Sequence, residues 1–458
     1  MQTNFNALQL GDPTIARADE ILRRCVHCGL CTGTCPTYVL TGDERDSPRG
    51  RIYLMKQMFE NCDVTSSTVQ HIDSCLSCLG CMTSCPSGVD YMHLVDLARV
   101  RIEQRGHRSI TQRMSRWFLS RVLPNPNRFR LMIGIGWFAR PFRNIFAKLG
   151  FRRTAAAPQL VPPNALKLKV LKPRSTLNPK APKPKRVALM LGCVQEVLAP
   201  SINHAAIRLL KRHGIDVMVV KDEACCGALS HSLGREEEAR AAARHNIDAW
   251  TAAMRERLLD AIVVTAGGCG TMVKDYGDLL ARDHGYAERA EYVSGLARDI
   301  SEFLDEVGLN PPVMWTGLKI AYHSACSLQH GQRLDELPRK LLEQAGYSLT
   351  DIPEGHLCCG SAGTYNILEP ELSGQLRDRK LENIESIEPD VIVTGNIGCM
   401  TQLKGGTTAP FVHTVELLDW ATGGPCPPAL IKMKDSAHPI EALVEMARAT
   451  ARDRELVD

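Results

Sequence analysis

Two runs of four cysteines near the N-terminus have the residue type and spacing needed to hold iron and sulfide. Each run reads C-x2-C-x2-C-x3-C-P, and every cysteine of the second run lies fifty positions after its counterpart in the first. The runs are Cys25, Cys28, Cys31, Cys35 with Pro36, and Cys75, Cys78, Cys81, Cys85 with Pro86. Three closely spaced thiolates can bind one cube of four irons, and such cubes move single electrons. The spacing therefore predicts two four-iron clusters.

The proline after each fourth cysteine predicts crossed ligation, because it directs that cysteine toward the neighbouring cube. One cluster would be bound by Cys25, Cys28, Cys31 and Cys85, and the other by Cys75, Cys78, Cys81 and Cys35. Structural zinc is an alternative, but it would leave one cysteine of each run and both prolines without a role. Disulfides fit less well, since adjacent C-x2-C triplets are poor crosslinks and no feature indicates an oxidising compartment.

Eight further cysteines form a second repeat in the other half of the chain. The first copy holds Cys193, Cys225, Cys226 and Cys269, and the second holds Cys326, Cys358, Cys359 and Cys399. The first three offsets are 133 and the last is 130, which indicates one unit copied with a short loop deletion. Buried free cysteine is common in protein cores. Two sets in matching register nevertheless favour a further metal or redox site in each copy. Gly227 and Gly360, which follow the Cys-Cys pairs, would let the backbone come close to a bulky group.

The elements expected around these cysteines change type along the chain. Apolar periodicity predicts helices over 14–24, 50–59 and 94–103, which would join the N-terminal cysteine loops. Strands are expected at 186–191, 215–220, 261–266, 319–323, 348–352 and 391–394, with helical patterns at 202–213, 235–259 and 271–282. Each repeated cysteine would then lie at the carboxyl edge of a parallel sheet. The expected fold class is α+β and multidomain, with a helical two-cluster ferredoxin domain followed by duplicated α/β cysteine-rich units.

The domain boundaries follow from these patterns. They are 1–103 for the ferredoxin domain, 104–151 for a basic amphipathic helical segment, 152–185 for a linker rich in proline and lysine, 186–310 and 318–423 for the two cysteine-rich units, and 424–458 for a C-terminal tail.

Positive charge is concentrated in one stretch of the chain. Between Gln104 and Arg186 there are 20 Lys or Arg and no Asp or Glu, so the remaining residues carry −16 to give the overall charge of +4. Within it, residues 128–153 interleave arginine with large apolar side chains, which is typical of an interfacial amphipathic segment. A helix pair packed on the ferredoxin domain, with its arginines in water, is an equal alternative. Nucleic-acid binding is not expected, because no recognised motif accompanies the charge.

Other signals bear on location and cofactors. The start of the chain has no basic and apolar leader, and the longest apolar run, Leu131 to Ala139, is far shorter than the roughly 20 residues of a spanning helix. A cytoplasmic protein is therefore expected. No G-x-G-x-x-G follows a predicted strand, so no flavin is expected on this chain.

Several residues near the repeats are not assigned as metal ligands. Arg49 and Arg51, between the two N-terminal loops, could tune cluster potentials or could form a solvated basic turn. Cys62 and Cys426 fall outside both repeats and are expected to be ordinary thiols. No ligand role is assigned to His323 or His413.

Four segments carry a resemblance to a known family. They are Arg24–Gly29 (RCVHCG), Asp46–Gln57 (DSPRGRIYLMKQ), His356–Tyr365 (HLCCGSAGTY) and Asn396–Cys399 (NIGC). With them, residues 14–420 resemble the iron–sulfur subunits of membrane-linked, flavin-dependent 2-hydroxyacid and glycerol 3-phosphate dehydrogenases, and most of all the glycolate oxidase iron–sulfur subunits. The resemblance implies no catalytic residue on this chain. It implies electron transfer from flavin-containing partner subunits, which oxidise glycolate to glyoxylate, to a quinone-type acceptor, with peripheral contact at the inner face of the cytoplasmic membrane.

The cysteine-rich units are also similar to heterodisulfide reductase, with one departure. There the last cysteine belongs to a C-x2-C, whereas Met272 and Gln402 occupy the corresponding positions here, so each unit offers four thiolates. Alternatives that stay open are a subunit for lactate or glycerol 3-phosphate oxidation, a thiol–disulfide reductase, and a binding module held together by metal.

Overall fold

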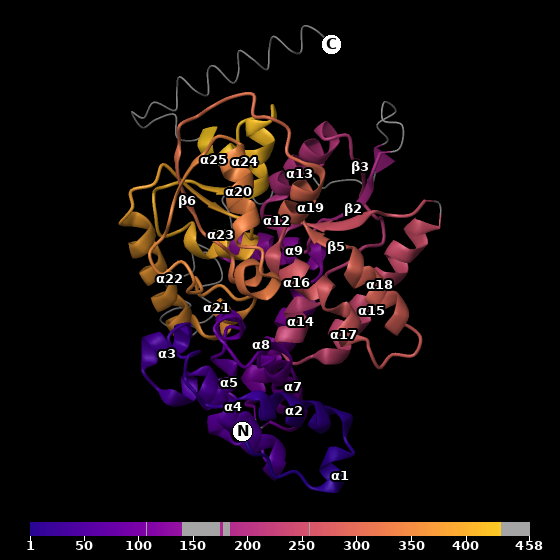
Figure 1. Cartoon of the computed structure of the whole chain (residues 1–458), viewed down its shortest axis with the longest axis vertical. Coiled ribbons are helices and arrows are strands. Elements are labelled where there is room, and N and C mark those ends of the chain that lie inside the picture. Colours follow the sequence, from indigo (N-terminus) through magenta and orange to yellow (C-terminus); the bar gives the residue numbers. More distant parts are fainter. Residues whose placement is uncertain (107, 140–174, 177–183, 256, 432–458) are drawn as a thin grey trace.

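The computed structural model describes residues 1–106, 108–139, 175–176, 184–255 and 257–431 (Figure 1). Most of the expected linker, the C-terminal tail after residue 431 and the basic segment after residue 139 therefore lie outside the described residues.

The N-terminal domain is built of helices connected by the cysteine loops. Its helices are α1 (Ala7–Leu10), α2 (Pro13–Arg24), α3 (Pro36–Thr41), η1 (Glu44–Asp46), α4 (Pro48–Asn61), α5 (Ser66–Asp73), α6 (Gly80–Thr83) and α7 (Tyr91–Arg105). Asp12 caps α2 by accepting a hydrogen bond from the Thr14 amide, and Pro13 occupies the first turn, where it is well tolerated. Leu22, Met55 and Leu94 are fully buried where α2, α4 and α7 meet. The three predicted helices are confirmed, and they form the core that holds the loops.

A helix pair, α8 (Ile110–Val122) and α9 (Pro126–Ala139), follows this domain. Arg116 on α8 is buried and forms an ion pair of 3.1 Å with Asp73. Arg130 on α9 bonds Glu196 at 2.8 Å, and Ile133 packs on Val197. In this pair Arg116 is therefore buried and Arg130 is partly exposed, while Arg113, Arg121 and Arg128 are exposed.

The first cysteine-rich unit is an α/β layer around a sheet of order β1-β3-β2-β4-β5. Its strands are β1 (Ser175–Thr176), β2 (Arg186–Met190), β3 (Asp216–Met218), β4 (Ala261–Val264) and β5 (Ala297–Asp299), all parallel except β1. Its helices are α12 (Gln195–Leu198), α13 (Pro200–Arg212), α14 (Ala228–Ser232), α15 (Glu236–Met254), α16 (Gly267–Lys274), α17 (Tyr276–Leu279), α18 (Ala287–Leu296) and α19 (Ile300–Val307). The single helix expected over 271–282 is two helices, because the chain leaves the helical path at Asp275.

The second unit repeats this arrangement with the strand order β7-β6-β8-β9, all parallel. Its strands are β6 (Lys319–Tyr322), β7 (Ser348–Thr350), β8 (Val391–Thr394) and β9 (Phe411–His413). Its helices are the π-helical η5 (Ser327–Gln332), α20 (Glu336–Gln344), α21 (Tyr365–Leu368), α22 (Pro370–Glu385), α23 (Ile397–Leu403), α24 (Thr414–Ala421) and α25 (Pro428–Ile431). The matching orders β3-β2-β4-β5 and β7-β6-β8-β9 confirm the duplicated parallel-sheet unit.

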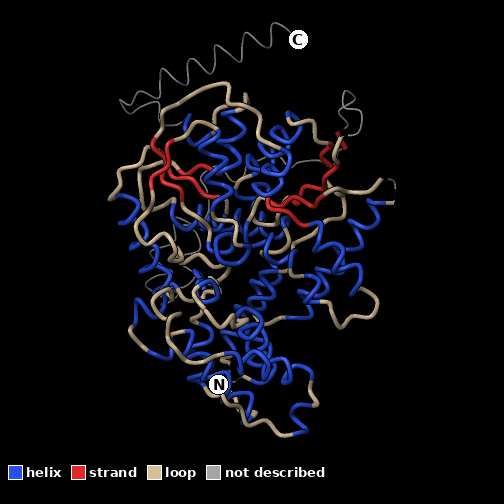
Figure 2. The backbone as a smooth tube through the Cα atoms, in the orientation of Figure 1, coloured by secondary structure: helices blue, strands red, loops and turns tan. Residues whose placement is uncertain are grey.

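The two units share one hydrophobic core. Figure 2 shows the two sheets with helices between them, and the buried cluster there includes Leu189 and Leu210 from the first unit and Leu342 and Trp420 from the second. Asp419 on α24 is fully buried, and Arg208 on α13 donates to it at 2.9 Å. The units therefore meet through apolar packing and a buried carboxylate with arginine partners.

The N-terminal domain touches both units, below them in Figure 1. His93 on α7 bonds Asp275 of the first unit at 3.0 Å, and Arg17 on α2 pairs with Asp278 at 2.7 Å. Thr83 on α6 bonds His330 of the second unit at 2.9 Å. The cysteine loops are thus held against both cysteine-rich units.

Candidate iron–sulfur centres and the cavity between the units

The eight N-terminal cysteines gather around two neighbouring hollows. Cys25, Cys28, Cys31 and Cys85 line the first, which Cys81 also touches, and Cys35, Cys75, Cys78 and Cys81 line the second. Cys35 caps the N-terminus of α3, whose first residue is Pro36, and this start carries its thiol away from the first loop. The fourth cysteine of each run therefore lies with the triplet of the other run, as crossed ligation requires.

Both cysteine loops contain residues with left-handed backbone conformation at matching positions. His27 and Gly29 in the first loop, and Ser77 and Leu79 at the matching positions of the second, have φ between 50° and 81°. This left-handed conformation is costly for side chains other than glycine and is retained where the surroundings demand it. Two such residues in each loop turn the chain tightly enough for three thiols to face one hollow.

The thiols of both hollows are largely buried and can act as ligands only as thiolates. Burial raises the pKa of Cys31 to about 11 and raises the pKa values of Cys78 and Cys81 well above their usual value. A thiolate is the form that binds metal, and bound cations offset the cost of burying its charge. Four thiols around each hollow are the complete ligand set of a four-iron cluster.

Two arginines differ sharply in their surroundings. Arg51 is 1% exposed and donates to the Cys35 sulfur at 3.6 Å, so its interpretation as part of a solvated turn is wrong. Burial would raise the pKa of Cys75, but Arg51 and Arg99 outweigh burial and lower it. Arg49 is partly exposed, and its guanidinium lies against Gly29 in the first loop. Fixed positive charge is therefore concentrated at the second hollow.

The four cysteines of the first cysteine-rich unit converge at the carboxyl edge of its sheet. Cys193 follows β2, and its sulfur lies 3.3 Å from that of Cys225. Cys226 is within hydrogen-bonding reach of Cys225 and of Cys269, which lies in the first turn of α16 after β4. Gly227 has φ of 90°, and a Cβ there would meet the Ala239 carbonyl at 3.1 Å. The tight turn after the Cys-Cys pair therefore requires glycine.

The second unit places its cysteines in the same way. The sulfur atoms of Cys326 and Cys358 are 3.8 Å apart, and Cys359 interacts with both Cys358 and Cys399. A Cβ on Gly360 would come within 2.6 Å of the Ser373 carbonyl. The repeated cysteines thus occupy matching positions in both copies.

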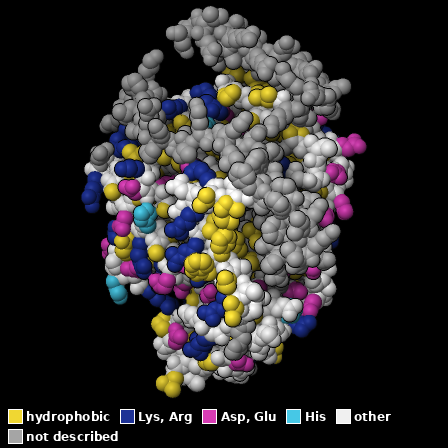
Figure 3. Space-filling view, turned by 180° about the vertical axis from the view of Figure 1, so that it is seen from behind, with side chains coloured by type: hydrophobic (Ala, Val, Ile, Leu, Met, Phe, Trp, Pro, Cys, Tyr) yellow, Lys and Arg dark blue, Asp and Glu magenta, His cyan; other side chains and the backbone are white. Residues whose placement is uncertain are grey.

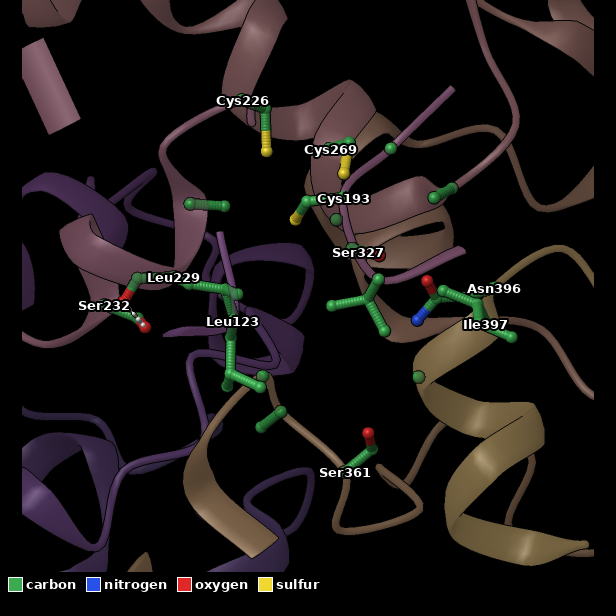
Figure 4. Close-up of a pocket in the computed structure, with 18 of the residues that line it drawn as sticks. Leu123, Cys193, Cys226, Leu229, Ser232, Cys269, Ser327, Ser361, Asn396 and Ile397 are labelled. Atoms are coloured by element: carbon green, nitrogen blue, oxygen red, sulfur yellow. Dashed lines mark hydrogen bonds between the residues drawn. The ribbon is translucent and has the colours of Figure 1, made fainter. Parts of the chain in front are cut away.

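Both cysteine sets line one cavity of about 810 Å³ between the units (Figure 4). In that view Cys193, Cys226 and Cys269 lie across the space from Ser361, Asn396 and Ile397 of the second unit. The described residues of α8, of α9 and of the turn between them contribute apolar side chains to its wall, among them Phe118, Leu123 and Ile135. The wall of the cavity is therefore formed by thiols from both units and by apolar side chains from the helix pair.

The second hollow adjoins the second cysteine-rich unit. Cys78 and Cys358 are both buried in one small apolar cluster with Tyr365, and Cys326 packs against it. The four cysteine groups are consequently contiguous, with the second N-terminal group beside the cysteines of the second unit.

His323 is the residue that the sequence-based assignment passed over. It follows β6, is 2% exposed, and has no hydrogen-bond partner for either ring nitrogen among the described residues. Burial, with a smaller effect of Lys380, lowers its pKa to about 3. His413, in contrast, bonds the Thr265 carbonyl at 3.0 Å and caps α24. Sequence alone places one histidine near each of two strand ends and does not distinguish them.

The two positions that lack a fifth cysteine are occupied by side chains with other contacts. Met272 is buried and lines the cavity, whereas Gln402 donates to Ser373 Oγ at 2.8 Å. Cys62 is exposed and belongs to neither N-terminal group.

These features define a multi-centre iron–sulfur protein in which a ferredoxin-type domain is joined to two cysteine-rich units. The 4Fe-4S dicluster domain family matches residues 24–90, and the cysteine-rich domain family matches residues 187–274 and 320–404. The glycolate oxidase iron–sulfur subunit of Escherichia coli is 44% identical over 92% of this chain and 99% of the relative. The probable glycolate oxidase iron–sulfur subunit of Bacillus subtilis is 33% identical over 92% and 99%.

A shorter relative matches about half of the chain. Lactate utilization protein A of Shouchella clausii is 28% identical over 51% of this chain and 98% of its own length. The full-length matches decide the family. The chain belongs to the glycolate oxidase iron–sulfur subunit family and is an oxidoreductase subunit of the iron–sulfur type.

Proposed function

We propose that this chain is the electron-transfer subunit of a complex that oxidises glycolate to glyoxylate. The flavin would lie on a partner subunit, and electrons would pass through this chain to a quinone-type acceptor. Iron–sulfur clusters bound by the cysteine groups would supply single-electron transfer. The observation that carries the proposal is the contiguity of those groups, which places Cys78 beside Cys358.

The positions of the four cysteine groups support a direction of electron transfer through the protein. Cys25, Cys28 and Cys31 lie in one loop of the N-terminal domain, and Val26 and Leu30 of that loop are exposed. The second hollow lies between this loop and the second unit. We therefore propose that the partner subunit docks near Val26 and Leu30, and that electrons leave through the cysteine-rich units.

The helix pair supplies a surface for contact with a membrane. Ile110, Met114 and Trp117 on α8 share one exposed face at helical spacing, and Leu131 and Ile135 are exposed on α9. Arg113, Arg121 and Arg128 on these helices are exposed as well. Figure 3 shows a band of hydrophobic side chains with Lys and Arg beside it on the face seen there. Apolar insertion with flanking arginine is the composition of an interfacial helix at anionic lipid.

The same surface suggests where the quinone-type acceptor would bind. Phe118 and Ile135 are exposed on the helix pair and also line the cavity whose wall includes the cysteines. An isoprenoid quinone has an apolar body and a polar head, which suits a cavity with an apolar side. Among the described residues no helix is long and apolar enough to cross a membrane.

The experiment is anaerobic co-purification of the chain with its untagged partners. Iron and acid-labile sulfide are measured, and visible bleaching is followed after addition of glycolate, lactate or glycerol 3-phosphate. Bleaching by glycolate is expected because the electrons of its oxidation would reduce this chain. Zinc without sulfide would end the electron-transfer proposal, whereas bleaching by lactate alone would keep the transfer role and change the substrate.

A further inference from the structure

His323 lies beside two cysteines of the second unit, and neither of its ring nitrogens has a hydrogen-bond partner among the described residues. One ring nitrogen and the sulfur atoms of Cys359 and Cys399 all lie within 4.8 Å of one another. The backbone amide of His323 bonds the Val393 carbonyl at 2.7 Å, which fixes the residue at the end of β6. Leaving a buried polar group without a partner costs about 1–3 kcal/mol. Such a group in a native protein needs an explanation, and a bound ion is one.

The first unit serves as an internal comparison. The offset of 133 residues places Met190 at the position of His323, and Met190 is buried in a core that includes Cys193 and Cys226. The residues that contact Gly227 and Gly360, Ala239 and Ser373, set an offset of 134 in the following helix, so Lys380 corresponds to the fully buried Asn246. The cysteines of the two units therefore match, while the groups around them do not.

Lys380 adds positive charge on the same side of the second unit. Its ammonium donates to the Glu354 carbonyl at 2.7 Å and is 2% exposed. Burial lowers the pKa of Lys380, and the thiols of Cys359, Cys358 and Cys399 act to raise it again. A buried cation near these thiols is consistent with a centre that carries negative charge.

We infer that the second unit binds its iron with an imidazole nitrogen of His323 in addition to thiolates from Cys326, Cys358, Cys359 and Cys399. The first unit, with Met190 at the equivalent position, is then thiolate-only. Imidazole is a common iron ligand, and exchanging thiolate for imidazole raises the potential of an iron–sulfur centre. The inference rests on the proposed presence of iron in the cysteine-rich units. It makes the two units electronically different despite their common origin.

The test is pulsed electron paramagnetic resonance on the anaerobically purified, reduced complex. The protein is prepared with ordinary histidine and with ¹⁵N-histidine, so that a ligating imidazole is distinguished from backbone amides. A strong nitrogen coupling that changes with the label is expected in the native protein. It should disappear in His323→Met, which reproduces the residue of the first unit, and in His323→Gln.

His413→Asn is the matched control, because it removes a buried histidine of the same unit whose ring already has partners. The labelled coupling should survive this change. His323→Cys should replace the imidazole with a fifth thiolate and shift the midpoint of the centre to lower potential. Thermal unfolding of each variant shows whether the unit still folds, and the shift in His323→Cys tests the ligand even if His323→Met is unstable.

Iron analysis distinguishes a failure of the His323 ligand from a failure of the iron centres themselves. Iron above the roughly eight atoms of two four-iron clusters, without a histidine coupling, overturns the role of His323 alone. Iron near eight, with the thiols of the cysteine-rich units freely alkylated, overturns the iron centres of those units and the inference together.

Discussion

The hydroxyl of Tyr365 donates a hydrogen bond of 3.1 Å to the carbonyl oxygen of Ser74, the residue before Cys75. Tyr365 begins α21 of the second cysteine-rich unit, a few residues after its Cys-Cys pair. One bond thus ties the loop that carries the second N-terminal triplet to the unit beside it.

Tyr365→Phe should loosen this joint. Loss of one buried hydrogen bond costs about 0.5–1.5 kcal/mol, and here it leaves the Ser74 carbonyl without that donor. Hydrogen–deuterium exchange over residues 74–81 should accelerate. Tyr347→Phe is the control, since its hydroxyl donates to Leu417 within the second unit at the same distance. Equal exchange in both variants would show that the joint has no special role.

Crossed ligation predicts which cysteine-to-serine variants lose the same cluster. Cys28→Ser and Cys85→Ser should each remove the cluster of the first hollow, whereas Cys78→Ser should remove the other. Iron should fall by about four atoms in each case. Spectra of the reduced variants check the grouping, and a Cys85→Ser protein that matches Cys78→Ser would contradict it.

Arg51→Lys should lower the reduction potential of the second N-terminal cluster. The guanidinium is buried against Cys35, and a hydrogen bond to a sulfur favours the reduced, more negative state, whereas Lys keeps the charge without the planar set of donors. Loss of its contacts with Thr37 and Ser74 should also cost about 0.5–1.5 kcal/mol of stability for each hydrogen bond. Redox titration should show a smaller change in Arg49→Lys, because Arg49 is partly exposed. A larger shift in Arg49→Lys would reverse the assignment.

The contact between the N-terminal domain and the first unit should weaken at alkaline pH. Burial would lower the pKa of His93, but hydrogen bonds with Asp275 and Asp90 raise it to about 10. A raised folded-state pKa gives stabilisation that is complete below the unfolded value of about 6.5 and is lost as pH rises through 10. Of the two carboxylates, Asp90 is the firmer partner, because its pKa is lowered despite burial, while burial raises that of Asp275.

His93→Gln should remove that pH dependence. Denaturant unfolding between pH 6 and pH 10 measures it. Arg17→Gln serves as the control, since it breaks an ion pair at the same contact without adding a group that titrates in this range. A slope that persists in His93→Gln would assign the effect to other groups.

Trp117→Glu should weaken binding to vesicles that contain anionic lipid. The change puts negative charge on the exposed face of α8, where apolar insertion and arginine attraction act together. High salt should release part of the native protein, because screening shortens the reach of the attraction. Leu258→Glu, at an exposed apolar position outside the helix pair, should leave sedimentation with vesicles unchanged. Salt-independent retention would contradict the peripheral contact.

The sequence determined the type of each half of the fold because period and register are local signals. Cysteine spacing located both repeats, and strand patterns followed by cysteine indicated the sheet edges. It could not distinguish Arg49 from Arg51, two residues apart, since only packing decides that Arg51 is buried. Nor could it separate His323 from His413, because the difference is whether a partner exists for each ring in three dimensions. Nor could it show that Arg116 on α8 is buried, because its carboxylate partner, Asp73, lies far away in the chain.

The shared cavity has a consequence for the order in which the protein is made. Both hollows of the N-terminal domain are lined by residues from the first part of the chain, ending with Tyr91. The cavity, in contrast, is walled by Cys193 near the middle of the chain and by Cys399 and Thr401 close to its end. Ribosomes therefore expose a complete ferredoxin site long before the cavity exists. If the cysteine-rich units bind iron as proposed, cluster delivery to this chain should occur in at least two separate events, the later one only after translation is nearly finished.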